Sequence, residues 1–443
     1  MAYKEIQMAQ PIMSEHYKNR KPSSIRVAQL RFLERTDGAG DVNVAIGNVS
    51  LPMHPAMIER MKRLGEPGSP FADGACQYTI TAGLPECCDA FRNILSSCGC
   101  ETDGLFVQIT DGGSVGMEMA VAGVSGAAGT SEQPILLIDA AYTNYKAFAN
   151  RLGRATVSVC RNLGDDGKFS LPSTEEIEKV IETHKPGALV VIPFDNPTGQ
   201  FYTQESLNAL ATLCVKHNLW LISDEAYREL KYTEDQTSSI WRITEDDVPG
   251  ITGRRIGIET SSKVWNACGL RVGALITDNA DFHRQSVAEY TANLCASAIG
   301  QWMFASLAHE SHEDLHKWYS QQREYYRDML VSFTNDLKAQ LPGVIVSSPD
   351  AAIYSVVDVR NVAGPDFDAM EFVKWCAGEG YVERDGKRMT LLTAPMSGFY
   401  NVGKGEPNPG RTQMRIAYVE PPERMALVPP LFAELFEKYQ ASR

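Results

Sequence analysis

The chain has no apolar run long enough to span a bilayer, and its first ten residues show no basic flank leading into an apolar stretch. Internal repeats and low-complexity tracts are also absent. These absences exclude a membrane-spanning chain, a secretory signal and a repeat architecture. We therefore expect a globular protein that works in the cytoplasm without a membrane partner.

The sequence also lacks the usual features of a metal site or a nucleic-acid partner. Among its ten cysteines, Cys87 and Cys88 are adjacent, Cys98 and Cys100 are closer than a zinc knuckle allows, and the eight histidines form no cluster near them. We expect no metal site, and we expect buried thiols in a reducing compartment. A net charge of −13 argues against DNA, RNA or an anionic membrane as the main partner.

What is present is an ordinary globular composition on a long chain. The 443 residues are 44% hydrophobic and 22% charged, and this length exceeds one ordinary core. We expect an N-terminal arm with part of a small domain over residues 1–60. A large domain should occupy residues 61–308, and a smaller C-terminal α+β domain residues 309–443.

Short apolar runs alternate with amphipathic ones through the middle of the chain. The pattern predicts strands at 105–110, 135–139, 155–160, 188–193 and 220–223, and helices at 114–124, 174–183 and 204–216. Such alternation predicts an α/β fold with a mostly parallel central sheet covered by helices. Ligands of these sheets bind at the carboxyl ends of the strands.

The pattern changes after about residue 304. A long charged helix is predicted over 309–340, followed by strands at 344–347 and 353–357 and a helix at 368–378. The glycine- and proline-rich stretch 396–410 is predicted to be a loop, and a strand at 413–418 follows it. These elements predict the smaller α+β domain.

One lysine stands in unusual surroundings. Lys263 follows hydroxyl residues in the run Thr260-Ser261-Ser262-Lys263, and Arg271 lies between two glycines eight residues later. An amine can form an imine with an aldehyde, while hydroxyls and a guanidinium can hold a phosphate. An aldehyde that carries a phosphate is pyridoxal 5′-phosphate, which its enzymes bind through a lysine. A surface charge is the alternative for a lysine considered alone.

Three further segments follow predicted strands, and each has a plain structural alternative. Asp111-Gly112-Gly113-Ser114 joins a strand to a helix and can cradle an anion, although a Gly-Gly pair is often only a turn. Asn196-Pro197-Thr198-Gly199 is also typical of a turn. Asp224 ends an apolar strand before Glu225-Ala226-Tyr227, where it could cap a helix or face a pyridinium nitrogen.

Taken in order, these four segments resemble the class I/II aminotransferases, the fold type I family of pyridoxal phosphate enzymes. The resemblance runs from about Ile46 to Tyr418. It implies that Lys263 binds the cofactor and then moves a proton as a base, while Asp224 faces the pyridine nitrogen and Tyr227 and Asn196 bind the 3′ oxygen. It also implies a set of phosphate ligands: Gly112, Gly113, Ser114, Thr260, Ser262 and Arg271.

The resemblance assigns further residues to the ring, the substrate and a second subunit. Tyr142 would stack on the cofactor ring. Tyr78 would reach the phosphate of a neighbouring subunit, which implies a homodimer with shared active sites. Arg415 would bind the α-carboxylate of the substrate, with Asn196 and the backbone at Gly47 beside it.

The substrate and the reaction stay open on sequence alone. No basic residue precedes Gln301 where dicarboxylate-specific members use a second arginine, although Arg20 or Arg26 could serve instead. We expect an exchange of the amino group between an amino acid, with aspartate favoured, and a 2-oxo acid such as 2-oxoglutarate. The alternatives on the same fold are a β-lyase, a decarboxylase and a cyclopropane-forming synthase. A DNA-binding ligand sensor is disfavoured because too few residues precede Val44.

Overall fold

The computed structural model describes residues 11–347, 349–403 and 405–443, so the predicted N-terminal arm is described from residue 11 onward. Its largest sheet has seven strands in the order β2-β8-β7-β6-β5-β3-β4. Only β8 runs antiparallel to its neighbours in this sheet. The strands are β2 (Phe106–Thr110), β3 (Ile135–Asp139), β4 (Thr156–Cys160), β5 (Ala188–Val191), β6 (Trp220–Asp224), β7 (Arg255–Thr260) and β8 (Gly273–Thr277). The predicted mostly parallel sheet is confirmed, whereas β7 and β8 were not predicted as strands.

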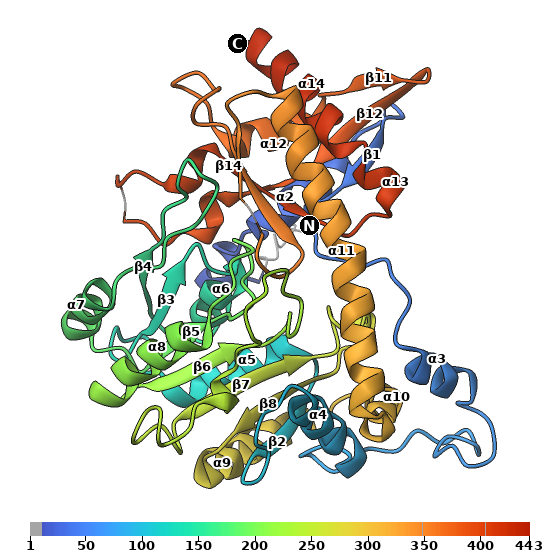
Figure 1. The fold of residues 1–443 in the computed structure, drawn as a ribbon, viewed down its shortest axis with the longest axis vertical. Helices are drawn as coiled ribbons and strands as arrows, with labels where there is room; N and C mark the ends of the chain where they lie inside the picture. Colours follow the sequence, from blue (N-terminus) through green and yellow to red (C-terminus); the bar gives the residue numbers. More distant parts are fainter. Residues whose placement is uncertain (1–10, 348, 404) are drawn as a thin grey trace, which may run out of the picture.

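Helices cover both faces of this sheet (Figure 1). One face packs against α5 (Gly113–Val124), α6 (Thr143–Arg151) and α9 (Ala280–Tyr290). The other face packs against α4 (Pro85–Ser97), α7 (Thr174–His184) and α8 (Gln204–Lys216). Successive strand residues alternate between the two clusters, as Leu136 and Leu137 do, because side chains of a strand point to opposite faces.

Local signals explain where several helices begin. Ser173 and Glu176 form a capping box at the start of α7. The hydroxyls of Thr203 and Ser311 accept hydrogen bonds from the first turns of α8 and of α11 (His312–Gln340). The long helix α11 runs from the C-terminal elements down to α10 (Ala298–Phe304), so it links the small sheets to the large one (Figure 1).

Two smaller sheets lie beyond the carboxyl ends of the large sheet (Figure 1). The first joins β9 (Ile345–Val346), β10 (Tyr354–Asp358), β13 (Ala394–Pro395) and β14 (Gln413–Ala417). The second joins β1 (Gly40–Asn43), β11 (Val382–Arg384) and β12 (Lys387–Leu392). Because β1 pairs parallel with β12, the N-terminal segment is anchored on the C-terminal part of the chain.

Helices surround these sheets and complete the fold. They are α2 (Ser24–Phe32), α12 (Ala369–Gly378), α13 (Pro422–Met425) and α14 (Val428–Ala441). The short helix α1 (Glu15–Lys18) precedes them in the chain, whereas α3 (Pro55–Lys62) lies beside α10, away from the small sheets (Figure 1). The predicted loop at 396–410 contains the short 3₁₀ helix Met396–Phe399 and the start of another, Pro409–Thr412. Within the residues described, no helix is both long and apolar enough to cross a membrane.

Candidate active site

A cavity of about 980 Å³ opens at the carboxyl ends of β5, β6 and β7, where the large sheet meets α2 and the strands β10 and β14. Most of the predicted site residues line it. They are Gly47, Gly113, Ser114, Tyr142, Asn196, Asp224, Tyr227, Thr260, Ser262, Lys263, Arg271 and Arg415. Residues more than 350 positions apart in the sequence therefore share one site.

Lys263 lies in the turn that follows β7. Its Nζ donates a hydrogen bond to the carbonyl oxygen of Gly47, which belongs to the segment after β1. A Cβ at position 47 would lie 2.4 Å from the hydroxyl of Tyr354 and 3.2 Å from Lys263 Nζ. This close approach favours glycine at position 47, where the backbone contacts the lysine.

One end of the cavity is suited to a phosphate. Helix α5 begins at Gly113 without a side-chain cap, so its first backbone N–H groups point toward the cavity end. The hydroxyls of Thr260 and Ser262 lie 2.8 Å apart beside it. A Cβ at Gly112 would lie 2.4 Å from Nη2 of Arg271, which shows how tightly the guanidinium packs on this loop. Arg271 forms no ion pair within the described part of the chain.

Asp224 lies at the end of β6 in the same cavity. Its Oδ2 accepts a hydrogen bond of 2.5 Å from Tyr145, and its Oδ1 accepts one of 3.1 Å from the backbone N–H of Ala226. Burial raises the pKa of this carboxyl to about 6, although the hydrogen bonds from Tyr145 and Ala226 oppose the shift. A cationic ring nitrogen next to Asp224 would favour the charged carboxylate. Tyr145, the partner of Asp224, was not among the predicted site residues.

A chain of polar groups links Tyr227 to the substrate end. Asn196 Nδ2 donates a hydrogen bond of 3.2 Å to the hydroxyl of Tyr227, which lies 2.8 Å from the hydroxyl of Tyr354. Burial raises the pKa of Tyr227 well above its usual value, so the phenol keeps its proton at neutral pH. Tyr354, on β10, also lines the cavity and was not among the predicted site residues.

Arg415 is a buried cation at the substrate end. The residue is 1% exposed, and its guanidinium donates to Asn196 Oδ1 at 2.9 Å and to the carbonyl oxygen of Ala45 at 2.7 Å. Its ring neighbours are Tyr354, at 4.3 Å from Cζ, and Phe399, at 5.2 Å. No carboxylate of the described residues forms an ion pair with it. Such a buried cation is suited to a carboxylate ligand.

The other residues named from the sequence lie partly inside and partly outside the cavity. Tyr142 lines the cavity and its hydroxyl accepts a hydrogen bond of 2.9 Å from Asn144. Tyr78 does not line the cavity and is 78% exposed. Gln301 is buried away from the cavity and donates to Thr79 at 3.0 Å. Of the two alternative arginines, Arg26 lines the cavity and Arg20 does not.

The donor set fits pyridoxal phosphate from end to end. An amine, a carboxylate and a buried guanidinium without an ion pair among the described residues line one cavity, together with the start of helix α5 and two hydroxyls that are suited to a phosphate. Together with the mostly parallel sheet and the small C-terminal sheets, these features define a fold type I pyridoxal phosphate enzyme.

Comparison with known proteins identifies the family within this class of enzymes. The sequence profile described as "Aminotransferase class I and II" matches residues 77–399, so the chain belongs to this family of pyridoxal phosphate-dependent aminotransferases. The aspartate/prephenate aminotransferase of Thermus thermophilus is 25% identical over 365 residues, which cover 81% of this chain and 87% of that protein. The aspartate aminotransferase of Musicola paradisiaca is also 25% identical, but the match covers 56% of this chain and only 58% of that protein.

Solved structures agree on the fold. The aspartate aminotransferase from Thermus thermophilus with maleate superposes with a TM-score of 0.77, and the match covers 96% of this chain and 100% of that one. The sequence identity of this pair is 21%, so the likeness shows the fold alone. The predicted fold type I architecture and the predicted family are thus confirmed.

Proposed function

We propose that this aminotransferase exchanges the amino group between an aspartate-type amino acid and a 2-oxo acid such as 2-oxoglutarate. The observation that carries the proposal is Arg415, a buried cation without a carboxylate partner among the described residues, in the same cavity as Lys263 and Asp224. Both substrates of such an exchange carry an α-carboxylate. A planar guanidinium binds this group in two parallel hydrogen bonds.

We propose that the other residues have the roles that the resemblance implies, and their places in the cavity support these roles. Bound pyridoxal phosphate supplies an electron sink for the carbon that loses its proton. We infer that Asp224 keeps a proton on the pyridine nitrogen and that Tyr227 and Asn196 hydrogen-bond the 3′ oxygen. Lys263 Nζ binds the cofactor and then carries the proton between the substrate Cα and the cofactor. Tyr142 stacks on the ring.

The phosphate ligands form a second proposed set at the other end of the cavity. We infer that they are the N–H groups of the loop and helix start, two hydroxyls and one guanidinium, contributed by Gly112, Gly113, Ser114, Thr260, Ser262 and Arg271. Helix α5 adds the positive end of its dipole, which favours an anion at this position.

Transamination is favoured over the alternative reactions on this scaffold. A β-lyase, a decarboxylase or a cyclopropane-forming synthase would use the same lysine and carboxylate, so the cofactor end of the cavity does not separate them. The names of the relatives support transamination, because they include aspartate, aspartate/prephenate and kynurenine–oxoglutarate aminotransferases.

Arg26 supports the choice of an acidic donor. It reaches the cavity from helix α2, and its guanidinium donates a hydrogen bond of 2.8 Å to Gln29 but forms no ion pair within the described residues. We propose that Arg26 binds the side-chain carboxylate of aspartate or glutamate, while Arg415 binds the α-carboxylate. Two arginines would then hold the two ends of a dicarboxylate.

The experiment compares amino donors. Arg26→Met should lower kcat/KM for aspartate by about 10- to 100-fold, because a charge-assisted hydrogen bond contributes ~1.5–3 kcal/mol. The value for alanine should stay within about twofold. Arg20→Met is the matched control, since Arg20 donates to Asn150 outside the cavity. Equal losses for both donors, or a wild-type preference for alanine, would contradict the assignment of an acidic donor.

We also propose a homodimer that works in the cytoplasm. Tyr78 is 78% exposed, and apolar side chains are exposed on neighbouring elements: Ile80 at 62%, Leu294 at 51% and Ile299 at 39%. A second copy of the chain would cover them and receive Tyr78 at its phosphate.

The free thiols fit a reducing compartment. We also propose that the chain divides as predicted, into residues 1–60, 61–308 and 309–443.

A further inference from the structure

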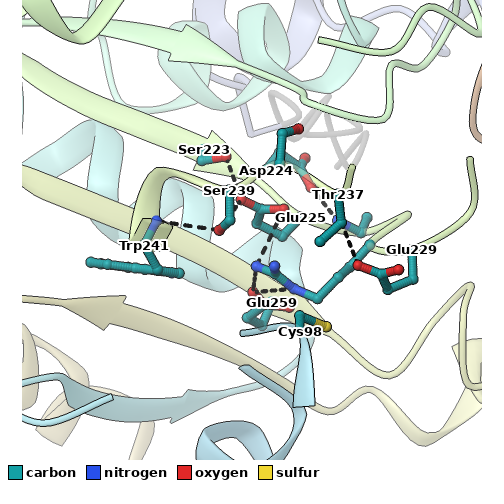
Figure 2. A network of polar contacts seen from close by, with 12 residues as sticks. Cys98, Ser223, Asp224, Glu225, Glu229, Thr237, Ser239, Trp241 and Glu259 are labelled. Carbon is teal, nitrogen blue, oxygen red and sulfur yellow. Dashed lines mark hydrogen bonds and ion pairs between the residues drawn. The ribbon is translucent and has the colours of Figure 1, made fainter. Parts of the chain in front are cut away.

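A buried charge cluster lies behind the cofactor end of the cavity. Its members are Glu225, Arg228 and Glu259, whose side chains are 0%, 3% and 5% exposed. Arg228 Nη2 lies 2.6 Å from Glu259 Oε1 and 3.2 Å from Glu225 Oε2. None of the three lines the cavity. Figure 2 shows Glu225 and Glu259 close together below the strand end that carries Asp224.

Each member of the cluster adjoins a residue that does line the cavity. Glu225 follows Asp224, Arg228 follows Tyr227, and Glu259 precedes Thr260. Glu259 and Thr260 are neighbours on β7, so their side chains point to opposite faces of the sheet. Glu225 and Arg228 lie in the segment that follows β6.

Backbone and side-chain bonds tie the two strand ends together at this point. The backbone N–H of Glu225 donates to the carbonyl oxygen of Ile258 at 2.9 Å, and that of Arg228 donates to the carbonyl oxygen of Glu225 at 3.1 Å. The guanidinium then bridges from the segment after β6 to Glu259 on β7. Movement of any one cluster member would therefore displace Asp224, Tyr227 or Thr260.

The charges of the cluster do not balance, since two carboxylates share one guanidinium. The nearby Glu229 does not change this count, because Arg323 Nη1 lies 3.3 Å from its Oε2. The other titratable groups that face the cluster are Asp224 on β6, the thiols of Cys98 and Cys100 after α4, and Tyr319 on α11. Burial raises the thiol pKa values, so these thiols stay neutral at neutral pH.

Burial acts on the two glutamates as well. It raises the pKa of Glu259 to about 7 and also raises that of Glu225, while Arg228 opposes both shifts. Neutral serines supply the remaining hydrogen bonds, from Ser223 Oγ at 2.8 Å and Ser239 Oγ at 3.4 Å to Glu225 Oε1.

We propose that Glu225, Arg228 and Glu259 are positioning residues that hold Asp224, Tyr227 and Thr260 against the cofactor. When both carboxyls are ionised, the cluster carries one excess negative charge, and this charge favours the protonated form of the cofactor. This inference rests on the proposed function, since it takes these three residues to face pyridoxal phosphate. The charge acts through the protein interior, where its effect is stronger than in water.

The experiment records the visible absorbance of the cofactor-loaded protein against pH, without substrate. Glu259→Gln keeps an oxygen that can accept from Arg228 but removes one carboxylate charge. Its titration midpoint should shift to lower pH by about 0.5 to 1 unit relative to wild type, because a nearby anion stabilises a protonated cofactor. Glu225→Gln should shift the midpoint in the same direction. The control is Glu182→Gln on the exposed side of α7, which should not shift it.

The outcomes separate this inference from the proposed function. Unshifted midpoints in both variants would overturn the charge role of the cluster, even if wild-type protein still responds to amino acids. Failure of both variants to fold would overturn it too, because the cluster would then be structural only. Loss of the wild-type response to amino acids would instead contradict the proposed function.

Discussion

At the scale of residues, we propose that three side chains from distant segments carry the chemistry of the cavity. Lys263, Asp224 and Arg415 supply an amine, a carboxylate and a buried guanidinium, and each is held by neighbours of its own. The sequence motifs predicted these three because each motif is local. Tyr145 and Tyr354 escaped prediction because their partners, Asp224 and Tyr227, lie 79 and 127 positions away.

Arg415→Ala should weaken amino-acid binding by about 100-fold and leave cofactor affinity within about twofold. Removing the guanidinium takes away both charge-assisted hydrogen bonds to the α-carboxylate. The half-saturating amino-acid concentration, measured from the cofactor absorbance, reports the effect. Arg415→Lys should recover little, because an ammonium lacks the planar fork. Loss of cofactor with unchanged amino-acid affinity would show that Arg415 has another role.

Asp224→Asn should stabilise the cofactor-free protein at neutral pH while weakening cofactor binding. The folded carboxyl has a pKa of about 6, above its unfolded value of 3.8, so the folded state binds the extra proton. The wild-type protein therefore loses stability as the pH rises from about 4 to 6, whereas the Asp224→Asn variant does not lose this contribution. The free energy of unfolding of the variant, relative to wild type, should rise by ~1–2 kcal/mol across this window.

Urea unfolding of the cofactor-free proteins at pH 4 and pH 7 measures this difference. The exposed Asp246→Asn is the control for loss of a carboxylate without burial. A relative stability of Asp224→Asn that does not change with pH would contradict the raised pKa of Asp224.

At the scale of elements, the site depends on where strands end and helices begin. The predicted strands and helices of the large sheet largely agree with the structure, because hydrophobic alternation marks them in the sequence. Strand β7 was not predicted, because Arg255, Gly257 and Glu259 interrupt its apolar run although the whole strand is buried. Strand β8, its antiparallel partner, was not predicted either. The pairing of β1 with β12 could not be predicted, because nothing local in either strand specifies a partner more than 340 residues away.

The loop between β2 and α5 offers a direct test of the phosphate cradle. Gly112 has φ +78°, and a Cβ there would lie 2.4 Å from Nη2 of Arg271. Gly112→Ala should therefore displace the guanidinium and lower cofactor affinity by about 10- to 100-fold. Gly129→Ala is a matched control, because Gly129 has φ +82° but no heavy atom within 4 Å of the added Cβ.

Equilibrium dialysis of cofactor against both variants would measure the effect. If the two substitutions lowered affinity equally, backbone strain rather than the clash with Arg271 would be responsible, and the cradle assignment would fail.

At the scale of the whole molecule, the proposed dimer should share its active sites. Tyr78→Phe should lower cofactor affinity by about 10-fold through loss of one phosphate hydrogen bond. Lys263→Ala should be inactive by itself. Mixed dimers of the two variants contain one site with Lys263 from one subunit and the intact Tyr78 from the other, so cofactor affinity and exchange should recover in that site.

Unfolding, remixing and refolding the two variants together tests this arrangement. After mixing in equal amounts, about half of the dimers are mixed and each holds one restored site. Recovery to about a quarter of the wild-type activity at low cofactor concentration would therefore support a shared site. A mixture that behaves as the average of the separate variants, or a monomer in sedimentation, would contradict it.

The central claim, amino-group exchange in this cavity, is tested most directly by one absorbance experiment. The purified, cofactor-loaded protein is titrated with single amino acids in the absence of any 2-oxo acid. We predict conversion of the cofactor to its amino form with aspartate, reversal on addition of 2-oxoglutarate, and neither change in Lys263→Ala. Continuous release of ammonia and a 2-oxo acid from the amino acid alone would contradict the account and point to a lyase.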